Sequence, residues 1–361
     1  MSGIVLSSAV RQNLLSLQST ASLLSTTQND LATGNKVNSA LDNPTNYFTA
    51  QGLNNRASDI NNLLDSIGNG VQVLQAANTG LTSLQSLVDT AKSIANQVLQ
   101  APAGYTTHST DSSTAAITGT AANLVDGTSI KSGDTLAFTA TTGLPAVTVT
   151  FGATESLTQL NTALAAGNLT ASLDSSNKLV ISTTNDAASS TIGTVTFSGG
   201  GSTPAAFAAA GSAPVADAAS QAIRASLVGQ YNNIITQITT TAQDSSFNGI
   251  NLLNGDNLKL TFDETAKSTL AINGVTFNAA GLGLASLASG TDFLDNSSAN
   301  AALTKLGAAS TVLRTEASAL GSNLSVVQIR QDFNKNLINV LQTGSSNLTL
   351  ADTNQEAANS Q

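Results

Sequence analysis

Apolar side chains recur at alternating spacings of three and four residues near both ends of this 361-residue chain. This spacing is that of positions a and d of a heptad, which place apolar side chains along one side of an α-helix. A long helix of this kind has to bury its apolar side against a partner along its whole length. The pattern therefore predicts long helices that are paired, either within one molecule or between neighbouring molecules.

Four runs carry the heptad pattern, at residues 10–31, 60–98, 223–238 and 303–341, and a three-residue slip interrupts the second run without ending it. Several a and d positions hold Ala, Ser, Asn or Gln, so we expect these helices to depend on partners for stability. We predict that the following residues form the subunit-packing seam: Val10, Leu14, Leu17, Leu24, Leu31, Leu64, Val71, Leu74, Leu313, Leu320, Leu324, Val327 and Leu341.

Residues 103–216 have a different composition, with short apolar and Thr-rich segments that alternate and with prolines near both borders. We predict strands at 135–140, 147–151, 169–173, 179–183 and 192–197, a helix at 156–165, and a flexible return link at 198–213. The predicted fold class is α+β: a long antiparallel α-helical coiled-coil bundle from both chain ends with β-hairpins, plus an inserted β-rich α+β domain.

The predicted organisation has three parts. Residues 1–42 form an N-terminal helix and turn, residues 43–102 and 217–361 form a helical domain with β-hairpins at 255–290, and residues 103–216 form an inserted domain. Gly34 suits the end of the first helix, and Asn43-Pro44 suits the start of the second. Asn273-Gly274 is predicted to be the tight turn of a hairpin between 258–262 and 270–277.

Composition excludes several functional classes. The chain has no cysteine and one histidine, so it lacks the ligands of disulfide scaffolds, thiolate metal sites and multi-histidine sites. Its net charge of −9 argues against binding to nucleic acid or to an anionic membrane surface. No apolar run is long enough to span a bilayer, and the N-terminus does not have the pattern of a cleaved signal peptide.

The candidate catalytic and ligand-binding motifs are weak. Ser109 and Asp111 follow His108 closely, but residues this close in sequence do not converge as a catalytic triad does, so we predict that His108 is a solvated linker residue. Asp263-Glu264 is predicted to be a solvated turn, because no calcium-loop spacing accompanies it. Gly281-Leu282-Gly283 lacks the third glycine of a dinucleotide fingerprint. We therefore predict no catalytic residues, no metal site and no cofactor, and hence a protein that is not an enzyme.

Three segments together resemble bacterial flagellin, the subunit of the flagellar filament. Residues 31–44, LATGNKVNSALDNP, are similar to the family's turn between its outermost N-terminal helix and the next helix. Residues 246–253, SFNGINLL, resemble its Phe-Asn-Gly motif, and residues 319–358 resemble its C-terminal helical region. In addition, residues 135–197 resemble a repeat module of the variable region of many flagellins.

The resemblance implies a structural subunit that polymerises into the flagellar filament for swimming motility. It also implies type III export without a cleaved signal peptide, an extracellular location, and as partners other copies of the chain, an export chaperone and the cap and junction proteins. Flagellins continue into a further C-terminal helix that pairs with the N-terminal one. Because this sequence stops at Gln361, we expect that helix to be missing and Val10, Leu14, Leu17 and Leu24 to lack their family partner.

Three other interpretations stay open at this point. A hook-filament junction protein shares the terminal helices of flagellin. A secreted adhesin would use the β-rich insert as its working part and would not need long helical ends. Some flagellins carry a metalloprotease insert, but the required His-Glu-x-x-His motif is missing from this sequence.

Overall fold

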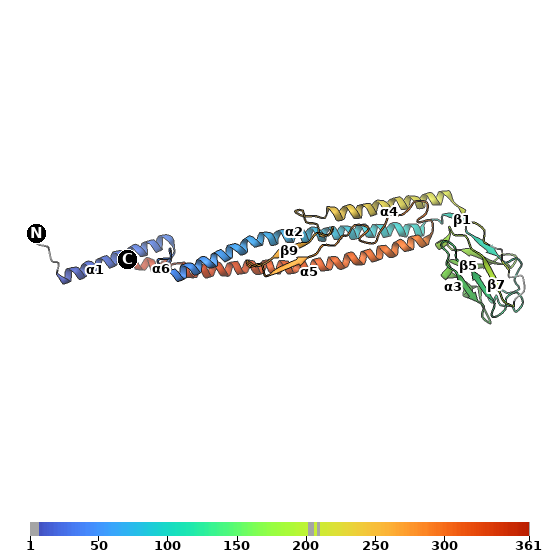
Figure 1. Cartoon of the computed structure of the whole chain (residues 1–361), viewed down its shortest axis with the longest axis horizontal. Helices are drawn as coiled ribbons and strands as arrows, with labels where there is room; N and C mark the ends of the chain where they lie inside the picture. Colours follow the sequence, from blue (N-terminus) through green and yellow to red (C-terminus); the bar gives the residue numbers. More distant parts are fainter. Residues whose placement is uncertain (1–6, 201–205, 208–209, 361) are drawn as a thin grey trace. The chain divides into compact units, whose positions relative to one another are not determined.

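The computed structural model describes residues 7–200, 206–207 and 210–360, and it has the predicted α+β composition (Figure 1). The chain divides into two compact units. The first comprises Met1–Asn78, Ser246–Gly274 and Ala319–Gln361, and the second comprises Thr79–Ser245 and Val275–Ser318. The two longest helices, α2 (Pro44–Gln100) and α5 (Asn296–Thr349), each contribute residues to both units.

The turn between the first two helices of the first unit forms as predicted. Helix α1 (Ser8–Thr33) ends at Gly34, whose φ of 74° lies in the left-handed region that glycine adopts without strain. Helix α2 begins at Pro44, where the missing N–H costs no hydrogen bond. The Asn43 side chain accepts a hydrogen bond from the N–H of Asn46 at 3.0 Å and so caps the helix.

The same turn is bonded to the end of α5. The N–H groups of Lys36 and Val37 donate to the carbonyl oxygen of Thr349, and the N–H of Ala351 donates to the carbonyl oxygen of Gly34. Helix α6 (Thr353–Asn359) then packs against α1. These contacts hold the C-terminal end of α1 in the first unit.

Helices α2 and α5 run antiparallel in the first unit. Ala57 and Ile60 of α2 form a buried cluster with Ile338 and Leu341 of α5. The Ser345 hydroxyl donates to the carbonyl oxygen of Ala50 at 3.2 Å, so later residues of α5 meet earlier residues of α2. This pairing agrees with the coiled-coil arrangement that the heptads predict.

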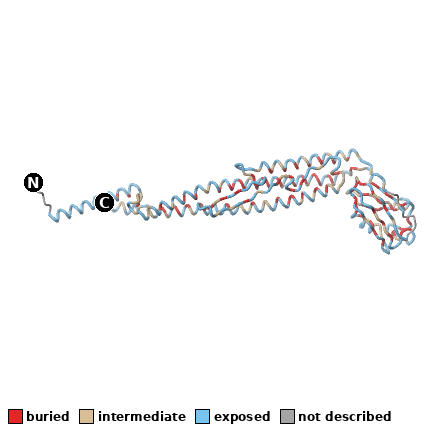
Figure 2. Tube along the Cα trace, viewed as in Figure 1, coloured by how far each residue is buried: buried red, intermediate tan, exposed pale blue. Residues whose placement is uncertain are grey.

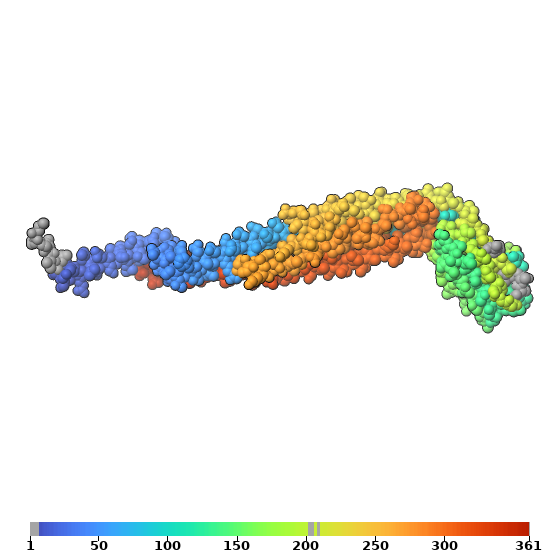
Figure 3. Space-filling model, in the orientation of Figure 1, coloured from blue at the N-terminus to red at the C-terminus, as the bar shows by residue number. Residues whose placement is uncertain are grey.

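A hairpin covers one side of this helix pair at the molecular surface (Figures 1 and 3). Its strands, β9 (Leu258–Thr261) and β10 (Thr269–Ile272), pair antiparallel. The Asp263 carboxylate closes the connecting loop by accepting from the N–H of Ser268. The prediction of a tight turn at Asn273-Gly274 is wrong, because β10 has already ended there. Residues 275–290 form turns, so the predicted hairpin region contains one hairpin.

In the second unit, α4 (Ala218–Asp244) buries Leu227, Tyr231 and Ile238 as the heptad pattern predicts. The predicted register is wrong at two other positions of this helix. Ile223 is exposed and Ile234 is half-buried, and Val228 and Ile235 are buried in their place. The buried face of α4 is therefore rotated relative to the predicted stripe.

The β-rich elements of the second unit form two three-stranded sheets. One has the order β2 (Thr110–Ser112), β6 (Leu179–Thr183), β5 (Leu169–Leu173), and the other has the order β4 (Val147–Thr150), β3 (Thr135–Phe138), β7 (Val195–Ser198). Helix α3 (Leu157–Leu164) begins with a capping box formed by Ser156 and Gln159, and η1 (Ala165–Gly167) follows it. Buried apolar residues of both sheets and of α3 form one core.

Short elements at the edges of this region were not predicted from the sequence. Strand β1 (Tyr105–Thr107) pairs antiparallel with β8 (Val215–Ala216), and the short helix η2 (Asn185–Ala187) follows β6. The predicted flexible return link lies partly outside the described residues. In its described part, the N–H of Gly211 donates to the carbonyl oxygen of Ile192, and the N–H of Ser212 donates to the carbonyl oxygen of Thr110. This part is therefore bonded to the β-rich region, and the prediction of a flexible link is wrong there.

Candidate assembly surfaces

The predicted seam residues fall into two groups. On α2 and α5 they face the interior: Leu64 and Leu324 are half-buried, and the others are buried, namely Val71, Leu74, Leu313, Leu320, Val327 and Leu341. On α1 all five are 39–68% exposed, namely Val10, Leu14, Leu17, Leu24 and Leu31. The structure thus brings the first group into intramolecular packing. The role of all thirteen in subunit contacts stays a prediction.

Helix α1 exposes apolar side chains along most of its length. Of its residues, which the structure describes in full, two are buried, Thr27 and Asp30, and both lie near its C-terminal end (Figure 2). The exposed apolar residues repeat at heptad spacing over several turns. Contiguous apolar patches of this kind typically mark interaction sites.

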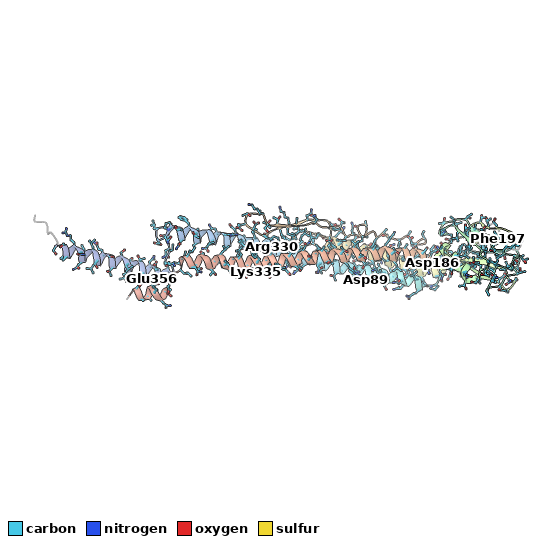
Figure 4. All side chains as sticks on the ribbon, turned by 90° about the horizontal axis from the view of Figure 1, so that it is seen from below. Asp89, Asp186, Phe197, Arg330, Lys335 and Glu356 are labelled. Carbon is cyan, nitrogen blue, oxygen red and sulfur yellow. The ribbon has the colours of Figure 1, made fainter. Side chains whose placement is uncertain are left out.

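A second exposed apolar surface lies on α5. Val326, Ile329, Phe333 and Val340 are 43–68% exposed and follow spacings of three, four and seven residues. We call these four residues the outward seam. Figure 4 labels Arg330 and Lys335 on the same stretch of α5. This surface was not predicted from the sequence, although the same heptad spacing in a second register indicates it.

The exposed face of α2 in the first unit has a different chemistry. It carries amide, hydroxyl and carboxylate side chains: Asn54, Asn55, Ser58, Asp59, Asn62 and Asp65. Phe48 near the start of α2 is 64% exposed, but no large apolar side chain is exposed from residue 54 to residue 65. The two paired helices therefore expose unlike faces, and the apolar one belongs to α5.

A hollow of about 370 Å³ lies between α2 and the hairpin. Its lining has apolar residues from both elements and a few polar ones: Leu63, Ser66, Asn69, Gly70, Val73, Asn248, Ile250, Leu258, Lys259, Leu260 and Thr261. A Cβ atom on Gly70 would come within 2.3 Å of Leu260 Cδ2, so any larger residue here would force the Leu260 side chain of the hairpin to move. Asn248 and Gly249, both with positive φ, form the two-residue turn at the edge of the hollow.

Acidic side chains meet where the C-terminal end of α1 lies close to α6. Burial raises the pKa of Asp30, and the negative charges of Glu356 and Asp42 raise it further. Hydrogen bonds from the N–H groups of Ser39 and Asn38 lower the pKa of Asp42. Asn38 also donates to Asp30 at 3.3 Å. The contact of α1 with the rest of the first unit therefore contains uncompensated negative charge.

Arg224 of α4 is the largest polar side chain buried in the second unit, at 1% exposure. Its guanidinium donates to the carbonyl oxygens of Pro102 (2.8 Å) and Ala101 (3.2 Å) at the end of α2. It also donates to the carbonyl oxygen of Phe293 at 2.8 Å and to the Asn296 side chain at 3.2 Å, both near the start of α5. Burial lowers the pKa of Arg224, and the charge of Asp295 opposes this shift. Arg224 thereby joins three chain segments beside the β1/β8 pair.

The weak catalytic and ligand motifs have structural roles. His108 is half-buried and its Nδ1 contacts the carbonyl oxygen of Thr183 at 2.7 Å, so it is not the solvated linker residue that we predicted. The Ser109 hydroxyl accepts from the N–H of Ile192. Glu264 pairs with Arg56 at 2.7 Å. In the described part of the chain, no three His, Cys, Asp or Glu side chains are grouped as metal ligands would be.

Comparison with known proteins places this architecture in a family. No curated protein sequence matches the chain, and within the described residues no helix has the length and hydropathy that a membrane span requires. Residues 5–131 match the model of the bacterial flagellin N-terminal helical region. Flagellins are structural proteins that associate with copies of themselves into the flagellar filament outside the cell. The match covers α1, α2 and the first strands after them, about a third of the chain, and it supports a bacterial flagellin.

Proposed function

We propose that this chain polymerises into the flagellar filament, that the filament serves swimming motility, and that α1 supplies one of the contacts between subunits. The observation that carries the proposal is the open apolar face of α1, where five heptad residues remain 39–68% exposed. Fully burying an aliphatic side chain stabilises an assembly by roughly 1.5–3 kcal/mol. Burial of all five would contribute roughly 7–15 kcal/mol, which is comparable with the free-energy cost of association.

The proposal includes the route by which the chain reaches the filament. The resemblance to flagellins favours type III export without a cleaved signal peptide, with an export chaperone, the cap and the junction proteins as further partners. The absence of cysteine is compatible with passage as an unfolded chain, because no disulfide has to be reduced first.

Electron microscopy under polymerising conditions tests the assembly role. We expect long helical filaments from the unmodified chain, and a large loss of filaments from Leu17→Asp, which puts a charge on the apolar face of α1. Ser22→Asp is the matched control, because Ser22 is exposed about 140° around α1 from Leu17 and its neighbours one turn away are polar: Gln18, Ser19, Ser25 and Thr26. Equal loss in both variants, or filaments from neither the parent chain nor the control, would contradict the proposal.

We further propose that residues 1–42, 43–102 with 217–361, and 103–216 act as filament core, helical domain and outer domain. The bonded ends of the third part support this division, because Tyr105 pairs with Ala216 and the N–H of Asp217 donates to the carbonyl oxygen of Gly104. A variant in which a short linker replaces residues 103–216 is expected to form filaments and to have a higher helical content per residue, because the long helices all lie outside the replaced segment. A folded variant that does not assemble would place the outer domain in the subunit contact.

A further inference from the structure

We propose that the outward seam of α5 inserts into the hollow between α2 and the hairpin of a second copy of this chain. The inference rests on the proposed function, since it names a second pair of surfaces through which subunits meet. It concerns surfaces of the first unit that are separate from the apolar face of α1.

The chemistry of the two surfaces is complementary. The outward seam presents an aromatic and three aliphatic side chains that project from a helix. The lining of the hollow includes the apolar residues Leu63, Val73, Ile250, Leu258 and Leu260, and polar groups of Ser66, Asn69, Asn248, Lys259 and Thr261 make up the rest of it beside Gly70. Binding pockets for small ligands begin at roughly 300 Å³, so a hollow of about 370 Å³ can take side chains of the size of Phe333 and Ile329. Aromatic anchors in such pockets are typical of interface cores.

The dimensions of the two surfaces also agree. Val326 and Val340 are separated by about 21 Å along α5, given a rise of 1.5 Å per helical residue. The segment of α2 that lines the hollow, Leu63 to Val73, extends for about 15 Å by the same rule. Ile329 and Phe333, in the first half of the outward seam, can therefore occupy the hollow while Val340 contacts its edge.

Polymer symmetry favours this pairing over contact between two outward seams. A patch that binds its own copy forms a closed dimer with two-fold symmetry, whereas two different patches on one molecule form an interface that can repeat without closing. A filament requires the second kind of interface. The apolar residues of α5 and the hollow beside α2 provide one such pair within a single unit.

The cysteine-free chain permits a direct test by cross-linking. Asn336→Cys puts a thiol at the heptad position between Phe333 and Val340 without removing an apolar residue of the seam. Ser66→Cys puts a thiol at the hollow, where Ser66 is exposed. The two single variants are mixed under polymerising conditions and treated with a short bismaleimide, and peptide mapping identifies the linked residues. Cross-links between residues 336 and 66 of different chains are the expected result.

Gln328→Cys is the matched control, because Gln328 is exposed at a helical position about 130° around α5 from the outward seam. Mixed with Ser66→Cys, it is expected to give at least tenfold less cross-linked dimer. Filaments that give no 336–66 cross-link, or that give mainly 336–336 dimers, would overturn the inference and leave the proposed function intact. If the parent chain forms no filaments, the proposed function fails and this inference fails with it.

Phe333→Ser gives an independent readout. It should reduce filament growth at least tenfold while the soluble chain keeps its circular dichroism spectrum and unfolding midpoint, because Phe333 is exposed in the single molecule. Phe333→Leu, which keeps an apolar side chain, should restore most of the growth. Normal growth of Phe333→Ser would overturn the inference.

Discussion

Helix α1 and the first half of α2 carry the same heptad spacing and differ in what covers it. The apolar residues of α1 are exposed, whereas Ile60, Ile67 and Leu74 of α2 are at most 1% exposed. Helix α2 has α5 beside it in the same chain, whereas α1 packs against the short helix α6 and the turn that follows α1 is bonded to Thr349. The comparison teaches that periodicity predicts which face of a helix is buried, and that it does not predict which molecule supplies the partner.

The largest effect is expected from truncating equivalent positions in the two helices. Ile67→Ala removes a fully buried side chain and should lower the free energy of unfolding by roughly 2–5 kcal/mol. Leu17→Ala in α1 should change it by less than about 0.5 kcal/mol, because that side chain is already in water. Urea unfolding followed by circular dichroism measures both. A large loss in Leu17→Ala would mean that α1 is packed in the monomer.

Substitutions at two glycines of α2 test how closely the rest of the first unit packs against this helix. Gly70→Ala should destabilise the first unit by roughly 1–3 kcal/mol, because the new Cβ overlaps Leu260 of the hairpin. Gly52→Ala has open space around it and should stabilise α2 by up to about 1 kcal/mol. Thermal unfolding midpoints should therefore move in opposite directions. A shift of the unfolding midpoint with the same sign in both variants would contradict the close packing of the hairpin against α2.

Acid should weaken the β-rich region, which has its own core. Burial would raise the pKa of Asp126, but hydrogen bonds from the Thr118 hydroxyl and from the N–H groups of Thr128, Ile130 and Ser129 lower it from 3.8 to about 2. Because the pKa of Asp126 is lower in the folded state than in the unfolded state, its ionised carboxylate stabilises the fold. This stabilisation is fully present above the unfolded-state pKa of about 4, and it is lost as the pH falls from about 4 to 2. After allowance for solvent screening, the loss is roughly 1–2 kcal/mol. Hydrogen exchange at residues 117–130 across this pH range measures it, and Asp126→Asn should remove most of the pH dependence.

The smallest effect is expected where α1 meets α6, and it has the opposite sign. Asp30 has a raised pKa, so the folded state binds its proton more tightly than the unfolded state, and the contact strengthens as the pH falls. Asp30→Asn should imitate this at neutral pH and gain a few tenths of a kcal/mol, measured as slower amide exchange at residues 27–37. Asp42→Asn is a control that should loosen the turn, because Asp42 accepts from the N–H groups of Asn38 and Ser39.

Local patterns predicted those elements whose stabilising contacts are close in sequence. The helix end at Gly34, the start at Pro44, the capping box of Ser156 and the strands at 169–173 and 179–183 all follow from short-range signals. The hairpin turn was misplaced because Asn273-Gly274 and the loop at Asp263 both have turn-forming composition, and the pairing of Leu258 with Ile272 decides between them. The α4 register failed because neighbouring Ile234 and Ile235 fit alternative stripes.

The assembly surfaces could be predicted only in part. The heptad spacing identified the exposed apolar residues of α1. The outward seam was not predicted, because the heptad assigned to α5 followed its buried apolar face and left its second, exposed apolar face unassigned. Arg224 gave no signal in the sequence. A buried guanidinium is stable only where acceptors surround it, and its acceptors come from segments about 70 and 120 residues away.

Most of the acceptors around Arg224 are main-chain carbonyl oxygens, of Ala101, Pro102, Phe293 and Leu294. A carbonyl oxygen is present whatever side chain its residue carries, so these hydrogen bonds do not depend on the local sequence. The length of chain between Gly104 and Ala216 is also only weakly constrained, because the entropy of closing a loop grows slowly with its size. The junction is consequently a site at which a foreign domain could replace residues 105–215, with Arg224 kept because its hydrogen bonds join the chain segments on both sides of the insertion.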